Sequence, residues 1–141
     1  MPKRAVSTPI GDIHDDLCET MPQSDQALIR DVLARVVDRW SLWALSELTE
    51  DGPLRFSRLL ERIDGVSQKS LTATLRELER DGFITRTVTA QVPIRVDYAA
   101  TPLGHALIER VHPLWLWAAE NLEAFTVART TYDQAKAAKM T

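Results

Sequence analysis

The chain has little of several features that define whole classes of protein. Only one of its 141 residues is a cysteine, Cys18, which excludes an intramolecular disulfide framework and favours a reducing compartment. The longest wholly apolar run, Leu114 to Ala119, is far shorter than the ~20 residues that a membrane span needs. No apolar stretch follows Lys3 and Arg4, so a secretory signal is not expected. These shortages predict a cytoplasmic globular protein without a membrane partner.

Patterns that carry enzymatic chemistry are also missing. The three histidines, His14, His105 and His112, are scattered, and no cysteine or carboxylate completes a metal-ligand set with His105 and His112 at a recognised spacing. The sequence contains no glycine-rich phosphate loop and no nucleophile elbow, and its paired carboxylates Asp15 and Asp16 lie in a segment without apolar periodicity. We therefore expect no enzymatic activity, no metal site and no cofactor.

The net charge is small, at −3, but it is unevenly distributed. From Pro53 to Arg95 the chain carries eight Lys and Arg residues against five Asp and Glu residues, so this segment is +3 and the remainder is −6. A local positive face is what phosphate binding requires, and the total charge does not reveal it. A solvated helix face with ordinary Arg–Glu pairs explains the same count, so charge alone leaves both interpretations open.

The N-terminal third predicts a flexible arm followed by two helices. Residues 1–24 are rich in Pro and Gly and lack apolar periodicity, which is typical of an arm. Ser24 or Asp25 can cap a helix with apolar residues at steps of three and four. A second helix is expected from about Ser41 until the Asp-Gly-Pro sequence at 51–53. Three residues near the start of this second helix are predicted to lie in the core because of their helical spacing: Trp40, Trp43 and Leu45.

The middle of the chain predicts a helix-turn-helix. A short amphipathic helix from Phe56 to Ile63 ends at an Asp-Gly pair. Ser67 is a good cap for a second helix, which turns Leu71, Leu75 and Leu78 inward and ends at the next Asp-Gly pair, 81–82. Two short helices joined by a tight turn, with polar side chains on the outer face of the second, are the plan of this DNA-binding motif.

After the helix-turn-helix, the spacing of apolar residues changes from the 3.6-residue period of a helix to the two-residue period of a strand. The segments 83–89 and 94–98 alternate and are rich in β-branched residues, which predicts a β-hairpin, the wing. Thr101 and Pro102 then open a long helix, which we expect to kink at Pro113 and to fray from Ala128. The predicted fold is mainly α with a β-hairpin wing: an arm at 1–24, a winged helix-turn-helix domain with dimerisation helices at 25–127, and a tail at 128–141.

The polar face of the second helix of the motif suits duplex DNA. Gln68 can pair with adenine and Lys69 with guanine, or each can contact only the backbone, while Arg76 can instead pair with Glu79 in solvent. The candidate DNA contacts are Ser67, Gln68, Lys69, Thr72 and Arg76 on the recognition helix, and Arg86, Arg95, Arg55 and Arg58 on the wing or against the DNA backbone.

Four stretches of the sequence resemble the HxlR family of winged helix-turn-helix transcription regulators. They are residues 51–56 (DGPLRF), 65–72 (GVSQKSLT), 92–98 (VPIRVDY) and 101–104 (TPLG), within a resemblance that extends from about residue 28 to 121. The resemblance implies a dimeric, cytoplasmic, DNA-binding repressor or activator of a bacterium or archaeon. Many members sense oxidants through a cysteine at the start of the first helix. That position falls near Ala27 here, so Cys18 is a displaced candidate for a redox residue.

The outer helices carry more apolar residues than a small winged domain can cover, which predicts a homodimer. The residues expected at its interface are Leu28, Val32, Leu103, Leu107, Val111, Leu114, Leu122 and Phe125. A small-molecule effector could lodge beside Trp43, Trp115 and Trp117, although tryptophans more often simply pack. We expect a regulator, more readily a repressor, on an inverted-repeat operator. The alternative is a protein-interaction module on the same fold, which would carry an acidic or neutral recognition face.

Overall fold

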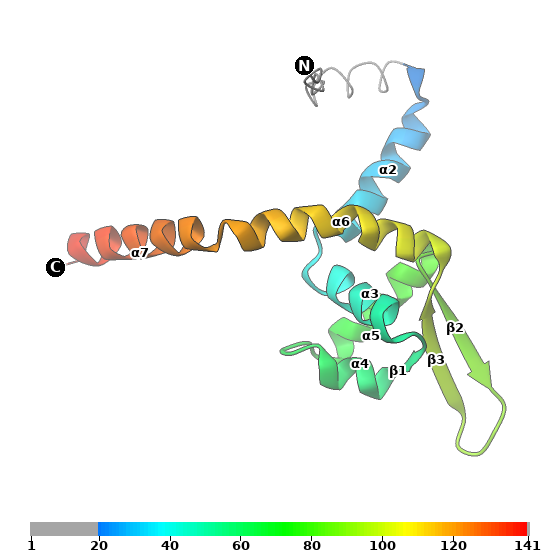
Figure 1. Cartoon of the computed structure of the whole chain (residues 1–141). Helices are drawn as coiled ribbons and strands as arrows, with labels where there is room; N and C mark the ends of the chain where they lie inside the picture. Colours follow the sequence, from blue (N-terminus) through cyan, green and yellow to red (C-terminus); the bar gives the residue numbers. More distant parts are fainter. Residues whose placement is uncertain (1–19, 141) are drawn as a thin grey trace, which may run out of the picture.

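A computed structural model describes residues 20–140 and shows a winged helix-turn-helix with long helices at both ends (Figure 1), which confirms the predicted fold class. Cys18 and most of the predicted arm lie outside these residues. The elements follow one another as α2 (Gln23–Val36), α3 (Arg39–Asp51), β1 (Leu54–Arg55), α4 (Phe56–Arg62), α5 (Gln68–Arg80), β2 (Ile84–Thr89), β3 (Arg95–Ala100), α6 (Pro102–Glu120) and α7 (Leu122–Lys139).

The first two described helices begin slightly earlier than the sequence predicts. The residue at the N-cap of α2 is Pro22, two or three positions before the expected caps, Ser24 or Asp25. Helix α3 starts at Arg39 because Asp38 caps it. The Asp38 carboxylate accepts hydrogen bonds from the backbone N–H of Ser41 at 3.0 Å and from its hydroxyl at 2.7 Å. The expected start at Ser41 is therefore two residues late.

The core lies where α3, α4 and α5 meet the base of the wing. Leu45 is fully buried as predicted, and Trp40 is half-buried against the core. Trp43 is 41% exposed, so its assignment to the core is wrong. It lies beside Trp40, with the two ring centroids 6.5 Å apart, on the outer side of α3. The buried cluster consists of Ala44, Leu45, Leu48, Leu59, Ile63, Leu71, Leu75, Leu78, Phe83 and Ile84.

The wing is an antiparallel sheet with strand order β1-β3-β2. Strands β2 and β3 form the expected hairpin, in which Ile84 lies opposite Ala100 and Thr89 opposite Arg95. The two-residue strand β1 was not predicted, because two residues are too few to show an alternating pattern. It places Arg55 opposite Asp97 and so joins the start of α4 to the base of the wing.

The start of α6 is locked to the domain. Thr101 caps the helix as predicted: its hydroxyl oxygen accepts from the N–H of Gly104 at 3.2 Å, and its hydroxyl donates to the Gly82 carbonyl at 2.6 Å. A Cβ atom on Gly104 would lie 2.3 Å from the Phe83 carbonyl oxygen and 3.1 Å from Leu45 Cδ1. Only glycine allows α6 to pack this closely over the base of the wing.

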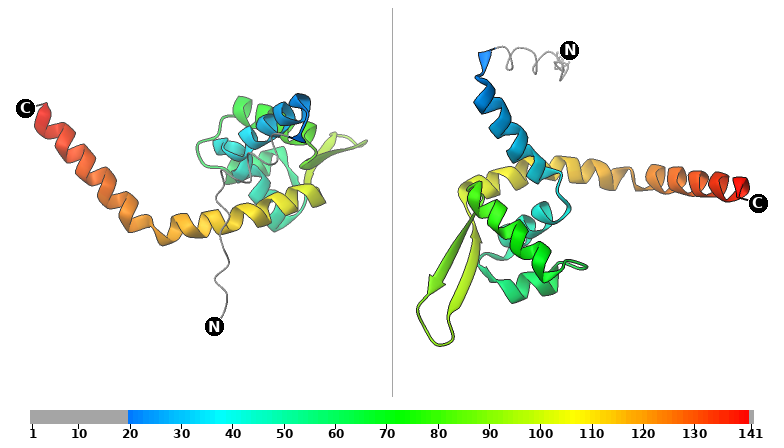
Figure 2. Two further views of the ribbon diagram at one scale, coloured as in Figure 1. Left: turned by 90° about the horizontal axis from the view of Figure 1, so that it is seen from above. Right: turned by 180° about the vertical axis from the view of Figure 1, so that it is seen from behind.

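The two C-terminal helices differ from the sequence-based prediction. Helix α6 continues through Pro113 to Glu120, and the chain bends at Asn121, so that α7 projects away from the domain (Figure 2). The Asn121 side-chain amide donates to the Trp117 carbonyl at 2.8 Å, a contact that competes with continued helix. The predicted fraying from Ala128 is wrong, because α7 extends to Lys139. Its many alanines have high helix propensity, and the positive charges of Lys136 and Lys139 interact favourably with the negative end of the helix dipole at its C-terminus.

Candidate nucleic-acid interface

Helix α5 is held rigidly from both its start and its inner face. Gly65, at φ +82°, makes the turn that precedes it. Ser67 is the predicted N-cap, and its oxygen accepts from the N–H of Ser70 at 3.0 Å. Leu71, Leu75 and Leu78 anchor the inner face in the core. The Ser67 hydroxyl is occupied by this cap and by Ser70, to which it donates at 2.9 Å. A phosphate at this end of α5 can therefore be bound by the backbone N–H groups of the first turn, and not by the proton of the Ser67 hydroxyl.

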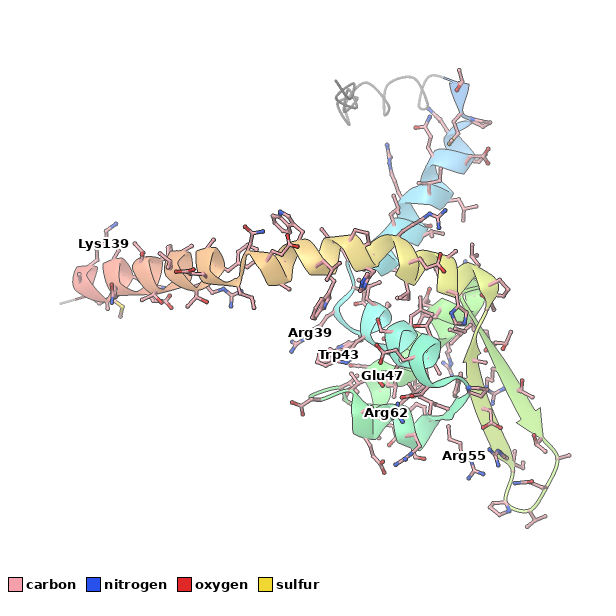
Figure 3. The ribbon with its side chains drawn as sticks, in the orientation of Figure 1. Arg39, Trp43, Glu47, Arg55, Arg62 and Lys139 are labelled. Carbon is pink, nitrogen blue, oxygen red and sulfur yellow. The ribbon has the colours of Figure 1, made fainter. Side chains whose placement is uncertain are left out.

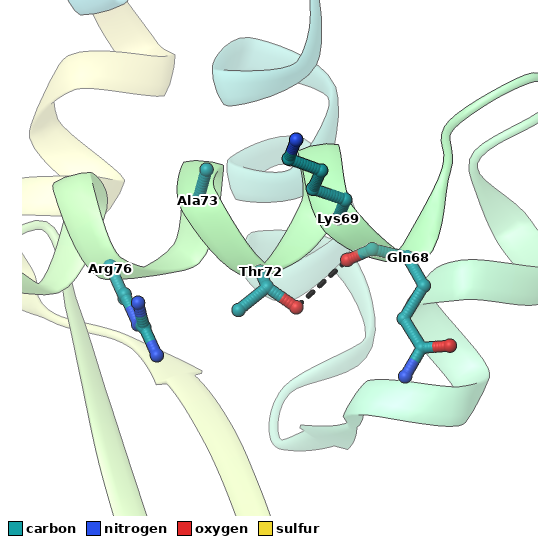
Figure 4. A pocket seen from close by; sticks show the side chains of 5 residues that line it. All are labelled: Gln68, Lys69, Thr72, Ala73 and Arg76. Atoms are coloured by element: carbon teal, nitrogen blue, oxygen red, sulfur yellow. Dashed lines mark hydrogen bonds between the residues drawn. The ribbon is translucent and has the colours of Figure 1, made fainter.

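The outer face of α5 forms a shallow depression that brings four of the predicted recognition residues together (Figure 4). Lys69 and Arg76 form no ion pair with any residue between 20 and 140, so both charges are available to a ligand. The alternative pairing of Arg76 with Glu79 is not seen. The depression is lined by Gln68, Lys69, Thr72, Ala73 and Arg76.

Ala73 is the lining residue that the sequence analysis missed. A single methyl side chain carries no signal for DNA binding, and only its position one turn after Lys69 marks it as part of the face. Thr72 contributes differently from expectation, because its hydroxyl donates to the Gln68 carbonyl at 2.8 Å. The middle of the face therefore presents methyl groups between the polar side chains.

The wing separates its two predicted arginines. Directly opposed residues of an antiparallel pair share a face, and faces alternate along each strand. Arg86 lies opposite Tyr98, on the face that Ile84 buries at the base of the wing. Arg95 lies opposite Thr89 on the other face, where its Nε donates to the Asp97 carboxylate at 2.9 Å. One flat DNA surface cannot meet both arginines in the same way.

The remaining predicted backbone contacts lie at the start of α4. Arg55 is exposed and precedes the helix (Figure 3), in register with Asp97 on the Arg95 face of the wing. Arg58 is paired with Glu61 at 3.2 Å on the surface, an exposed pair that costs little to break. Arg62 is paired with Asp51 and with Glu47, at 3.2 Å from the latter. These two carboxylates raise the pKa of Arg62 above its usual value, Asp51 most strongly, so this cation serves the fold.

Arg35 connects the first helix to the recognition helix. From the last turn of α2 its guanidinium pairs with Glu77 of α5 and, through Nε, with the Asp81 carboxylate at 3.1 Å. The Asp81 side chain is only 12% exposed, so this end of the contact is well shielded from water. These partners are more than forty positions from Arg35 in the sequence, so no local sequence pattern predicts the contact.

The predicted interface residues divide into two groups within one protomer. Val32 and Leu107 pack against the domain core, and Val111 is half-buried. The other predicted residues are exposed, and they lie on α2, α6 and α7 as Leu28, Leu103, Leu114, Leu122 and Phe125. The apolar surface that a partner would need is therefore present, mostly on the outer helices.

The three tryptophans of the predicted effector site are exposed on α3 and α6. Trp43 contacts Trp40, over which Arg39 places its guanidinium 4.5 Å from the ring centroid (Figure 3 labels Arg39 and Trp43). Trp117 packs edge-on against Phe125, with centroids 5.8 Å apart. Among residues 20–140 no ring contact joins Trp43, Trp115 and Trp117 to one another.

Residues 20–140 contain neither a metal-binding cluster nor a membrane-spanning helix. Between residues 20 and 140 no three His, Cys, Asp or Glu side chains gather so that they could hold a metal ion. Within that range no helix combines the length and the apolar character that crossing a membrane requires.

Comparison with known proteins agrees with this geometry. The family model for the HxlR-like helix-turn-helix matches residues 35–126. The chain is 41% identical over 106 residues to the uncharacterized HTH-type transcriptional regulator YtfH of Escherichia coli (strain K12), covering 75% of this chain and 83% of that protein. These relatives are transcriptional regulators and not enzymes.

Solved structures show the same likeness. The transcriptional regulator ytfH from Salmonella typhimurium superposes with a TM-score of 0.65 at 40% identity, covering 72% of this chain and 89% of that one. The reduced form of the transcriptional regulator YodB from B. subtilis has a TM-score of 0.57 at 31% identity, covering 70% and 91%. The chain therefore belongs to the HxlR-like helix-turn-helix family and is a transcriptional regulator.

Proposed function

We propose that this regulator binds double-stranded DNA as a homodimer, with α5 in the major groove and the wing against the neighbouring backbone. The observation that carries the proposal is the outer face of α5, where Lys69 and Arg76 form no ion pair with any residue from 20 to 140 and lie beside the Gln68 amide. An unpaired Lys or Arg can read a guanine edge or neutralise a phosphate, and an amide can pair with adenine. A protein-interaction module is expected to carry an acidic or neutral face here, whereas this face carries Lys69 and Arg76.

The charge pattern supports the same assignment. Near the C-terminal end of α5, Glu77 and the capping residue Asp81 both pair with the Arg35 guanidinium, whereas Glu79 is exposed. Arg55 and Arg86 add further exposed cations, one on each face of the wing sheet. The protein can thus attract a polyanion locally although its net charge is −3.

The exposed apolar residues of the outer helices support the homodimer. Leu114, Trp115, Leu116 and Trp117 follow one another on α6, and all four are exposed in the single protomer. Four consecutive positions cover almost the whole circumference of a helix, so this part of α6 needs cover on several sides. A two-fold dimer supplies that cover, and it sets two α5 helices about one DNA turn apart, ~34 Å, on an inverted repeat.

The test begins with selection of bound sites from random duplex DNA, followed by determination of the stoichiometry on the selected site. We expect an inverted repeat that binds two protomers. Arg76→Ala should weaken binding to it, while Arg129→Ala, which removes the same charge from α7, should not. Failure to enrich any sequence, or equal losses for the two variants, would contradict the proposal.

The same dimer gives the proposed regulation. We propose that the protein acts in the cytoplasm as a repressor, and that a small aromatic effector binds where Trp43, Trp115 and Trp117 meet at the dimer junction. Their exposure in one protomer supports this idea, because a partner would close the site. YodB from B. subtilis has been solved both reduced and diamide-treated, which makes a redox signal through Cys18 the second candidate. Tryptophan fluorescence on titration with aromatic acids, in wild type and Trp43→Leu, tests the first.

A further inference from the structure

The recognition face of α5 is polar at its ends and apolar in its middle (Figure 4). Gln68 and Lys69 occupy the first turn, and Arg76 lies two turns further along the same face. Thr72 and Ala73 lie between them. At 1.5 Å per residue the polar ends are ~10 Å apart along the helix axis, roughly three base-pair steps. The middle therefore faces base edges that neither polar end reaches.

The Thr72 hydroxyl is already committed to the helix. Its Oγ1 donates to the Gln68 carbonyl at 2.8 Å, so its proton is not free for a base. This bond fixes the rotation of the side chain, and Figure 4 shows the Thr72 methyl group on the side away from it. The outward chemistry of Thr72 is then that of a methyl group beside a hydroxyl oxygen that can accept a hydrogen bond but has no proton left to donate.

Ala73 completes the same spot. Its side chain is exposed and carries nothing beyond Cβ, so it holds no donor or acceptor and lets a base edge approach the helix closely. In the major groove only thymine presents a methyl group, whereas guanine presents two acceptors, O6 and N7, for which this spot has no free donor.

We propose that Thr72 and Ala73 form a methyl-reading spot that selects thymine at one central position of each operator half-site. The proposal rests on the proposed DNA-binding function. It adds a specificity that the polar residues do not supply, because Gln68, Lys69 and Arg76 read hydrogen-bonding groups on the flanking bases. It also gives Ala73 a role that forbids a larger side chain.

The test replaces each thymine of the selected operator, one position at a time, by deoxyuridine, which removes only the 5-methyl group. We expect one central position at which replacement raises the dissociation constant about fourfold in one half-site and about 16-fold in both, as burial of one methyl group predicts. Other thymines should tolerate the change. Fluorescence anisotropy with wild-type protein provides the constants.

Two substitutions of Thr72 separate methyl from hydroxyl. Thr72→Ser keeps the hydroxyl and removes the methyl, so it should abolish the difference between thymine and deoxyuridine at that position. Thr72→Val keeps a methyl and removes the hydroxyl, so it should preserve the difference. Thr126 on α7 makes the same type of bond, to the Leu122 carbonyl at 2.9 Å, and Thr126→Ser is the matched control with no expected effect.

The outcomes distinguish this proposal from the function on which it rests. If the wild-type protein selects no DNA, both fail. If it binds a selected operator that lacks a central thymine, or that tolerates deoxyuridine everywhere, the methyl-reading spot is wrong and the DNA-binding function stands. If Thr72→Val loses the discrimination and Thr72→Ser keeps it, the hydroxyl reads the base and the proposal is overturned.

Discussion

Leu45 and Leu114 lie on two helices of the same protomer, and their surroundings are opposite. Leu45 on α3 is completely buried between the recognition helix and the start of α6, whereas Leu114 on α6 is 59% exposed. Helix α6 itself spans both situations, since Gly104 is pressed against Phe83 and Trp115 is exposed. The winged domain completes its core within one protomer, whereas the outer helices α2, α6 and α7 carry exposed apolar side chains that the proposed dimer would cover. The two regions should therefore respond differently to the same substitution.

The largest difference is expected in unfolding. Leu45→Ala should lower the free energy of unfolding by about 2–5 kcal/mol, because it opens a cavity in a closed core. Leu114→Ala should cost far less in the monomer, where the side chain already meets water. Urea denaturation at a protein concentration low enough to dissociate dimers gives both values. Equal losses would show that the outer helices are part of the protomer core.

The reverse difference is expected in assembly. Leu114→Asp should weaken the dimer by about 2–4 kcal/mol, since a charge would replace an anchor residue at the centre of the apolar surface. Val92→Asp places the same charge at another exposed apolar residue, on the turn of the wing, and should leave the dimer intact. Light scattering at micromolar concentration reports the mass. A wild-type protein that is monomeric there would contradict the proposed dimer.

A smaller effect is expected where the two regions are tied together. Arg35→Leu should destabilise the protein by about 1–3 kcal/mol, because it leaves the shielded Asp81 carboxylate without its charged partner. Arg58→Leu breaks an exposed pair within α4 and should cost no more than about 1 kcal/mol. Urea denaturation of both variants makes the comparison. A loss for Arg35→Leu as small as that for Arg58→Leu would mean that α2 does not depend on this contact.

The smallest effect is expected at Cys18. Its distance from the sensing position near Ala27 predicts that Cys18→Ser changes neither DNA binding nor the response to oxidants. Gel-shift titration with and without diamide, on both proteins, makes the test. If diamide releases the parent protein from DNA while the variant stays bound, Cys18 is the sensor.

The recognition helix was predictable because independent local signals agree there. Ser67 caps it, glycines bound it, and leucines three and four residues apart define its inner face. The wing was predictable for the same reason, but the opposite faces of Arg86 and Arg95 were not, since they depend on strand register.

The outer helices were less predictable because much of their apolar surface is exposed in the protomer and their contacts involve residues far along the chain. The alanines of α7 favour helix without marking an inner face, so the segment resembled a fraying end. Trp43 has the spacing of a core residue and yet is exposed. The contact of Arg35 with α5 follows from packing across the fold and from no local sequence signal.

In the proposed complex, α5 reads bases while the wing anchors the protein to the DNA backbone. The direct measurement titrates Lys69→Ala and Arg95→Ala against the selected operator and scrambled DNA at several salt concentrations, with Lys139→Ala as the remote control. Lys69→Ala should cost about 1–3 kcal/mol and relax one base position per half-site, whereas Arg95→Ala should weaken both DNAs equally and lower the salt slope by roughly one per subunit. A change of base preference in Arg95→Ala alone would reverse the assignment, and no change in either variant would contradict it.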